Sequence, residues 1–237
     1  FRIAANADLT PQLWRVAAKG RANGIDFETL GPVRIIPKRS EYEIQLATIK
    51  IADGSVKLAG SYGNGIELQS RLDNVNIAVL NPFLPGLGLR GRATGSLDWS
   101  QASMAAFPRT DARLEIKRFV RSNLGSVSQP VDISVIGRLL PEGGNARAIV
   151  RRLGAPVGRL HINLTPLPPG NAAWTERLLA APLSGGIRYN GPADTLFSLA
   201  AVADQSLTGN IGVAADFSGR VQAPRLPGVL RATALVS

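Results

Sequence analysis

The stretch Ala112-Arg113-Leu114-Glu115-Ile116-Lys117 alternates strictly between apolar and charged residues. The same alternation, with polar partners, runs through Val131-Asp132-Ile133-Ser134-Val135 and Leu160-His161-Ile162-Asn163-Leu164-Thr165. A period of two places the apolar side chains on one face of a β-strand and the polar ones on the other. These stretches therefore predict half-buried strands of an antiparallel sheet.

Further strands are expected on the N-terminal side of this region. The run from Tyr42 to Ile51 alternates with a phase slip near Thr48, which indicates a β-bulge. Asp53-Gly54 predicts a tight turn into Val56-Lys57-Leu58. A second turn at Tyr62-Gly63-Asn64-Gly65 is expected to lead into Ile66-Glu67-Leu68. Three C-terminal strands are expected at 209–217, 219–223 and 229–236.

Turn-forming residues and two short segments with helical character separate these strands. Loops rich in Gly, Pro, Ser and Asn are predicted at 100–109, 121–130, 141–146 and 166–171. A helix is predicted over 172–181, after an Asn171 cap and before Pro182, and one helical turn over 75–80. Neither segment is long enough for a βαβ unit. The predicted class is therefore all-β with one or two short helical inserts.

Composition agrees with this class. The 237 residues are 45% hydrophobic but only 5% aromatic, and they include 25 Gly and 16 Pro. Many turns between short elements are typical of all-β chains. No cysteine is present, so disulfides and thiol chemistry are excluded. Because the sequence opens with Phe1 rather than methionine, we expect it to be part of a longer protein whose signal or anchor lies upstream.

The net charge of +10 favours anionic partners, either nucleic acid or lipid headgroups. The basic residues are spread along the chain, and the densest runs are pairs such as Lys117-Arg118 and Arg151-Arg152. Nucleic-acid binding requires basic residues interleaved with aromatic ones on one surface. Because no such cluster is visible, we expect no nucleic-acid partner and interpret most of the charge as a solvated strand face.

Catalytic signals are weak. The one histidine, His161, falls on the polar side of an alternating strand, where a solvated residue is expected rather than a catalytic base. The segment Gly86-Leu87-Gly88-Leu89-Arg90-Gly91 matches a dinucleotide fingerprint, but prolines precede it and a strand-like run follows it. No spacing typical of a zinc or calcium site occurs. We therefore expect neither enzymatic activity nor a cofactor or metal.

A weak internal repeat supports an elongated sheet. Leu89-Arg90-Gly91, Leu183-Ser184-Gly185 and Leu207-Thr208-Gly209 each follow a loop and begin a new strand. Repeated strand entries of this kind are typical of stacked, extended sheets rather than closed globules.

Two regions resemble the C-terminal, β-rich part of the TamB family of translocation and assembly proteins. The first, 72–97, contains a strand, a short apolar segment ending at Asn81-Pro82, then Leu89-Arg90-Gly91 and a fresh strand. The second, 207–228, ends in Gly219-Arg220-Val221-Gln222-Ala223-Pro224-Arg225-Leu226-Pro227-Gly228, similar to a family signature apart from Pro227. Shorter family-like phrases occur at 155–159 and 189–192. The resemblance extends over most of 40–237.

The resemblance implies a fold and a location. TamB-like proteins are anchored in the inner membrane of Gram-negative bacteria and reach across the periplasm. Their strands form an elongated, curled antiparallel or mixed sheet, a taco-like groove with an apolar inner face. We accordingly expect one elongated domain over 1–237, with a division into sub-units 1–100 and 101–237 left open, in a periplasmic segment.

The resemblance also implies a function in cell-envelope biogenesis and a set of partners. The expected function is to shield phospholipid acyl chains during transport between the inner and outer membranes. A TamA-like outer-membrane assembly barrel is the expected protein partner. The family carries no catalytic residues, so none is transferred.

The residues of the alternating strands supply the candidate groove. A curled sheet with one apolar face can cover acyl chains instead of a second sheet, and small aliphatic residues leave room for them. The candidate groove residues are Ile44, Leu46, Val56, Leu58, Ile66, Leu68, Leu114, Ile116, Val131, Ile133, Val135, Leu160, Ile162, Leu164, Ile211, Val213 and Phe217.

Two alternatives remain open at the level of sequence. The apolar face could pack on another sheet in an ordinary sandwich, and the alternation alone supports this as well as a groove. A scaffold that binds outer-membrane protein precursors by β-augmentation at a strand edge is the second. The family resemblance favours the groove.

Overall fold

The computed structural model describes residues 2–82, 88–122, 127–170, 172–200, 208–225 and 228–236. These residues form a single sheet of sixteen strands, so the all-β prediction is confirmed. Every strand pairing in the sheet is antiparallel. Most neighbours in the sheet are also neighbours in the chain, because short turns join consecutive strands into hairpins.

The strands are β1 (Arg2–Leu9), β2 (Trp14–Ala22), β3 (Ile25–Thr29), β4 (Val33–Pro37), β5 (Glu41–Ile51), β6 (Gly54–Gly63), β7 (Ile66–Asn76), β8 (Leu89–Gln101), β9 (Arg109–Arg121), β10 (Val131–Leu140), β11 (Gly143–Arg152), β12 (Ala155–Leu164), β13 (Leu183–Pro192), β14 (Thr208–Arg220), β15 (Ala223–Arg225) and β16 (Gly228–Val236). The helical elements are the 3-10 helix η1 (Ile77–Leu80) and the α-helices α1 (Trp174–Leu179) and α2 (Ala193–Ala200).

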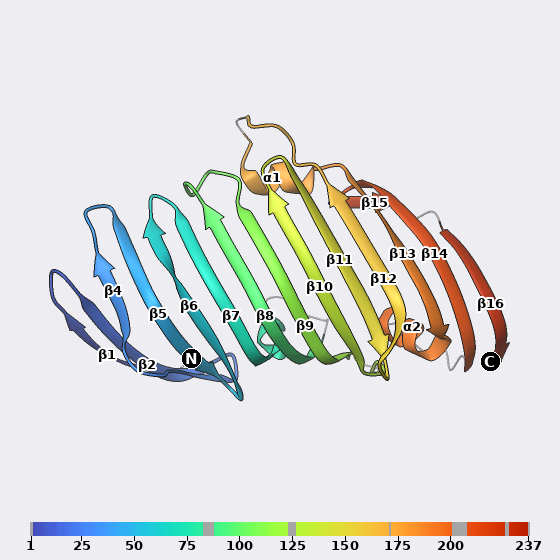
Figure 1. Cartoon of the computed structure of the whole chain (residues 1–237), viewed down its shortest axis with the longest axis horizontal. Helices are drawn as coiled ribbons and strands as arrows, with labels where there is room; N and C mark the ends of the chain where they lie inside the picture. Colours follow the sequence, from blue (N-terminus) through green and yellow to red (C-terminus); the bar gives the residue numbers. More distant parts are fainter. Residues whose placement is uncertain are drawn as a thin grey trace.

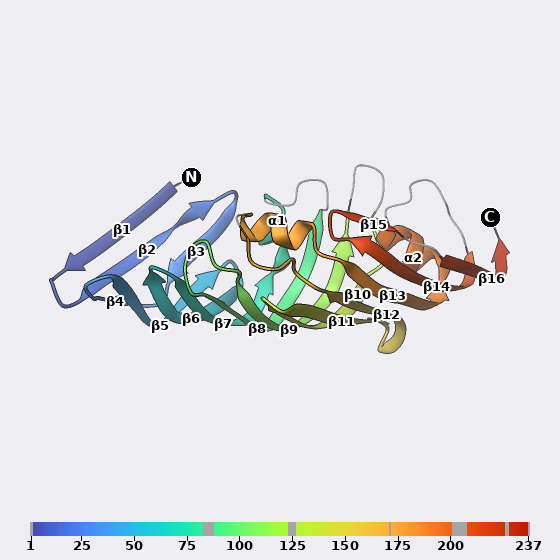
Figure 2. The same ribbon diagram turned by 90° about the horizontal axis from the view of Figure 1, so that it is seen from above.

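The sheet is elongated and curled. Figure 1 shows the strands side by side in one tilted row along the long axis, with α1 and α2 at opposite ends of the strands. In Figure 2 both helices lie on the same side of the row, and β1 and β2 rise toward that side at one end. The sheet therefore has an inner side, which carries the helices, and an outer side. It continues across residue 100, where β8 pairs with β9.

The turn predictions in the N-terminal half are confirmed. A two-residue turn, Ala52-Asp53, joins β5 to β6, and Ala52 adopts a positive φ of 50°. The next hairpin turns at Asn64-Gly65, between β6 and β7. The pairing of β5 with β6 shifts register between Ile44 and Ala47, so a bulge is present but lies before the position near Thr48 where it was predicted.

The helix predictions are confirmed in outline. Helix α1 falls within the predicted 172–181, but its N-cap residue is Ala173, which makes no side-chain capping bond. Asn171, expected as the cap, lies outside the described residues. The turn predicted over 75–80 is η1, where the Asn76 side chain accepts a hydrogen bond from the Ala78 N–H at 3.0 Å. Helix α2 is an addition that the sequence did not suggest.

Two boundaries were wrong. The loop expected at 141–146 is only Pro141-Glu142, because Gly143 already belongs to β11 and continues its ladder with β10. The strand expected at 219–223 is instead the end of β14, a turn at Val221-Gln222 and the start of β15. Leu89 and Leu183 begin strands as expected, whereas Leu207 lies outside the described residues.

Candidate functional site

The inner side of the sheet carries lengthwise rows of uncharged residues, which we call the apolar face. Cross-strand register defines each row, because directly paired residues point to the same face of an antiparallel sheet. One unbroken row crosses ten strands from β5 to β14. Its members are Ile49, Val56, Leu72, Gly95, Leu114, Val135, Ala148, Leu160, Ile187 and Ala215.

Three neighbouring rows repeat this composition. The row through Ile133 contains Val75, Ala93, Ile116, Ile133, Val150, Gly158, Tyr189 and Val213. The row through Ile162 contains Ala47, Leu58, Ser70, Leu97, Ala112, Gly137, Ala146, Ile162, Gly185 and Phe217. The row through Leu164 contains Ile44, Gly60, Leu68, Trp99, Thr110, Leu139, Gly144, Leu164 and Leu183.

The opposite side of the sheet, the polar face, carries the charges of the strands. Ion pairs cross between neighbouring strands there, for example Arg138 Nε to Asp111 Oδ2 at 3.2 Å and Arg188 Nη2 to Asp216 Oδ1 at 2.8 Å. His161 lies in register with Arg147 and is exposed on this face, as the alternation predicted. Charge is thus segregated from the apolar rows along the length of the sheet.

All but one of the predicted groove residues lie on the apolar face. The exception is Leu46, which was placed there wrongly. At the bulge, Gln45 and Leu46 together stand opposite the single residue Ala59. Ala59 belongs to the polar face, and Leu46 is 74% exposed. Ala47 takes the position that Leu46 was expected to hold.

The apolar face is half-covered rather than sealed. All sixteen strands belong to one sheet, and in the described part of the chain no second sheet packs on this face. Among the groove residues, Val131, Ile211 and Phe217 are buried, and the others on this face are only half-buried. The sandwich alternative requires a second layer that these residues do not provide.

One long border of the apolar face is closed by η1 and α2. Ile77 of η1 packs with Leu89 and Ala93 at the start of β8. Farther along the same border, Leu196 and Phe197 of α2 pack against a buried cluster that includes Tyr189 and Ile211. These contacts cover the strand ends, whereas the middle of the rows is only half-buried by the residues that the structure describes.

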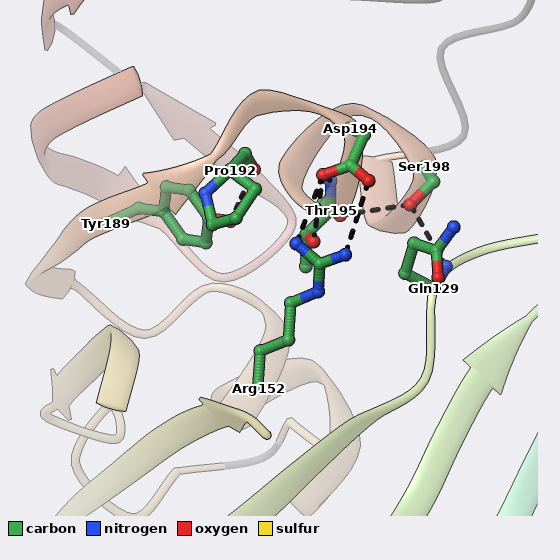
Figure 3. Close-up of polar contacts among 7 residues, drawn as sticks. All are labelled: Gln129, Arg152, Tyr189, Pro192, Asp194, Thr195 and Ser198. Carbon is green, nitrogen blue, oxygen red and sulfur yellow. Dashed lines mark hydrogen bonds and ion pairs between the residues drawn. The ribbon is translucent and has the colours of Figure 1, made fainter. Parts of the chain in front are cut away.

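Polar contacts hold α2 in this position, as Figure 3 shows. The Tyr189 hydroxyl donates to the Pro192 carbonyl oxygen at 2.7 Å, just before the helix begins. Burial raises the pKa of Tyr189 above its usual 10.0. The Arg152 guanidinium reaches both carboxylate oxygens of Asp194 at 3.4 and 3.5 Å. Asp194 lies in the first turn of α2, where a negative charge is favourable.

The loop before β10 is tied to the same helix. The Ser198 hydroxyl donates to the Thr195 carbonyl oxygen at 3.1 Å and accepts from the Gln129 N–H at 3.3 Å (Figure 3). Arg121, at the end of β9, donates from Nη1 to the Leu199 carbonyl oxygen at 3.3 Å. Helix α2 therefore contacts β9, β11, β13 and β14 as well as the loop before β10.

The opposite border is closed by α1 and an aromatic cluster. Trp99, in the row of the apolar face that passes through Leu164, meets Trp174 edge to face with ring centroids 6.1 Å apart. Phe107 packs edge-on against Trp174 at 6.3 Å, and the Arg177 guanidinium lies 5.2 Å from the Phe107 ring centroid. This cluster was not foreseen, because its members come from a strand, a loop and a helix that are distant in the sequence.

The remaining sequence motifs carry no site in the structure. Leu89 to Gly91 of the glycine motif form the start of β8, so a strand occupies the position where a dinucleotide fingerprint requires a helix. Gly86 and Leu87 of the same motif lie outside the described residues. The described residues contain no cluster of three or more His, Asp or Glu side chains suited to a metal ion. None of their helices combines the length and apolar character that crossing a membrane demands.

Comparison of the chain with protein-family models, with curated proteins and with solved structures finds no match.

Proposed function

We propose that the apolar face shields phospholipid acyl chains, and that the chain is a TamB-like segment of a Gram-negative envelope protein serving lipid transport between membranes. The observation that carries the proposal is the set of unbroken uncharged rows, half-buried along the middle of the single-layer sheet that the described residues form. A row such as Leu114, Val135 and Leu160 continues from strand to strand without a charged residue.

The energetics of burial support a long apolar guest. Each methylene removed from water contributes about 0.8 kcal/mol, so two acyl chains covered over part of their length bind favourably. The small residues in the rows, such as Gly95, Gly137 and Ala146, leave depth between the larger aliphatic side chains. The basic excess on the polar face also favours approach to an anionic membrane surface.

The test is site-specific photocrosslinking in living cells combined with native mass spectrometry of the purified chain. A crosslinking amino acid at Val135 points to the apolar face, and one at the next residue, Ile136, points to the polar face. Phospholipid adducts are expected at position 135 and not at 136. Equal labelling at both positions, or none at 135 with no lipid co-purified, would contradict the proposal.

One structural feature favours the second candidate function, a scaffold for outer-membrane protein precursors. Among the described residues strand β1 pairs with β2 alone, so its outer edge leaves backbone N–H and C=O groups available to another strand. All eight residues of β1 are exposed. Crosslinks from Ala4 or Asn6 to peptide, in place of lipid adducts at Val135, would favour this function.

A further inference from the structure

A recess of about 800 Å³ lies next to the aromatic cluster at the α1 border, and we call it the α1 recess. Hairpin tips of the sheet and the segment that leads into α1 form its walls. Ile66, a residue of the apolar face, lines the recess, and so does Phe107 of the aromatic cluster. The recess therefore adjoins the region where acyl chains are proposed to lie.

Arg177 is the unusual residue of this recess. It is only 8% exposed, and its Nε donates to the Leu167 carbonyl oxygen at 2.9 Å. No carboxylate among the described residues lies within 4 Å of its guanidinium. A buried guanidinium without a counter-ion is costly, whereas its planar fork of donors matches a phosphate group.

Three further charged residues line the recess without forming ion pairs among the residues that the structure describes. They are Glu41, Glu67 and Arg109. By register Glu67 and Arg109 belong to the polar face, because both pair with Ser100, so they line the recess only at its rim, at the strand ends. Lys38, close to Glu41 in sequence, instead pairs with Glu43 at 2.8 Å. Two acidic and two basic residues thus line one open volume, and in the described part of the chain none of them lies within 4 Å of an opposite charge. A ligand that carries both signs can satisfy them together.

We propose that the α1 recess binds the zwitterionic headgroup of a phospholipid, with its phosphate at Arg177 and its amine at Glu41 and Glu67. The inference rests on the proposed lipid function and adds the class of headgroup and the position it takes. The aromatic residues Trp99 and Trp174 then lie at the boundary between headgroup and acyl chains, where amphipathic rings are favourable.

The experiment compares lipids with identical acyl chains and different headgroups. The purified chain is offered equimolar phosphatidylethanolamine and diacylglycerol in detergent, and native mass spectrometry counts the bound lipids. The wild-type chain is expected to prefer the phospholipid by about tenfold, the effect of one charge-assisted contact. Arg177→Gln is expected to reduce this preference to about twofold or less while diacylglycerol uptake is retained.

The outcomes separate the two proposals. Equal uptake of both lipids by the wild-type chain, or an unchanged preference in Arg177→Gln, overturns the headgroup inference alone. Uptake of neither lipid overturns the proposed function itself. Far-UV circular dichroism and Trp fluorescence establish whether Arg177→Gln retains the fold.

A second variant keeps the inference testable if Arg177→Gln does not fold. The double variant Glu41→Gln with Glu67→Gln changes side chains that are not buried. The wild-type chain is expected to prefer phosphatidylethanolamine over phosphatidic acid, which lacks the amine, and the double variant is expected to lose this preference. Glu115→Gln, at a glutamate that does not line the recess, is the matched control and is expected to leave the preference for phosphatidylethanolamine unchanged. Equal wild-type uptake of the two phospholipids overturns the assignment of the amine to the glutamates.

Discussion

Ile133 and Ile136 lie three residues apart on β10 and face opposite sides of the sheet. Ile133 is in register with Ile116 and Val150 on the apolar face. Ile136 is in register with Arg113 and Arg147 and is 61% exposed on the polar face. The pair holds strand and residue type constant while the face changes, so it isolates the contribution of the apolar face.

The first prediction uses this pair. Ile133→Asp is expected to lower phospholipid occupancy by about tenfold or more, because it places a charge among uncharged rows. It is also expected to cost about 2 kcal/mol of unfolding free energy, whereas Ile136→Asp stays within about 0.5 kcal/mol of wild type. Native mass spectrometry and urea unfolding measure the two effects. If Ile136→Asp lost lipid as strongly as Ile133→Asp, the face would not determine binding.

The second prediction concerns two glycines of the apolar face. Gly95 has a φ of 145°, and a Cβ there would collide with the Arg113 carbonyl oxygen on β9. Gly95→Ala is therefore expected to destabilise the fold by about 2 kcal/mol. At Gly137, whose φ is not positive, a Cβ would meet Ala146 Cβ at an ordinary 3.5 Å. Gly137→Ala is expected to be neutral or to stabilise by up to about 1 kcal/mol.

Urea midpoints of the two glycine variants give the comparison directly. The size of the added methyl group is the same in both, so only the backbone conformation and the room on the facing strand differ. Equal midpoints for Gly95→Ala and Gly137→Ala would show that the close approach of β8 and β9 does not constrain this position.

Much of the sheet was predictable because one face is half-buried. In β9, β10 and β12 the alternation of residues such as Leu114 and Glu115 shows which side chains point to the apolar face. The register of the strands then places these side chains next to one another. The error at Leu46 shows the limit of this reasoning. A bulge moves one residue to the other face, and only the pairing with β6 reveals that Ala47 replaces it.

The borders of the apolar face were less predictable. Strands β1 to β4 were not predicted, and in β1 small residues such as Ala5 and Ala7 weaken the alternation. Helix α2 is short, and its apolar side becomes evident only once Tyr189 and Ile211 are in place beneath it. The α1 recess gathers Glu41, Arg109 and Arg177 from distant segments, so no local pattern signals it.

The third prediction concerns Asp132 and the dependence of stability on pH. Its carboxylate accepts a hydrogen bond from the Arg118 N–H at 2.9 Å, at a bulge where Arg118 has a φ of 50°, and pairs with Lys117 Nζ at 3.2 Å. The Arg118 N–H first, and then Lys117, lower the pKa of Asp132 below its usual 3.8. A lowered pKa contributes stability that is present above 3.8 and lost as the pH falls through the folded-state value.

Asp132→Asn keeps an oxygen acceptor for the Arg118 N–H and removes the charge. The stability difference between wild type and Asp132→Asn is therefore expected to shrink between about pH 6 and about pH 2 in urea titrations. Asp132→Ala also removes the acceptor and is expected to cost about 1 kcal/mol at neutral pH. As a control, Asp26→Asn breaks only the exposed pair with Arg21 and is expected to change stability by less than about 0.5 kcal/mol. A constant difference across the pH range would refute the role of the charge.

The fourth prediction concerns the hydroxyl that holds the start of α2. Tyr189→Phe leaves the Pro192 carbonyl oxygen without its donor and is expected to cost about 1 kcal/mol at neutral pH. Because burial raises the pKa of Tyr189, the phenol contributes stability that is fully present below pH 10.0 and is lost as the pH rises through its folded-state value.

Wild type is accordingly expected to lose stability more steeply than Tyr189→Phe above about pH 10. Urea unfolding of the two proteins at neutral and alkaline pH measures this difference, and Tyr62→Phe, at an exposed tyrosine of the apolar face, is the control. The same Tyr189 packs with Ala193 and Ile211 at the border of the apolar face. As the pH rises, protease cleavage within Ala193–Ala200 is therefore expected to increase at a lower pH in wild type than in Tyr189→Phe, because α2 is released there first. The opposite order would show that the Tyr189 hydroxyl does not anchor α2.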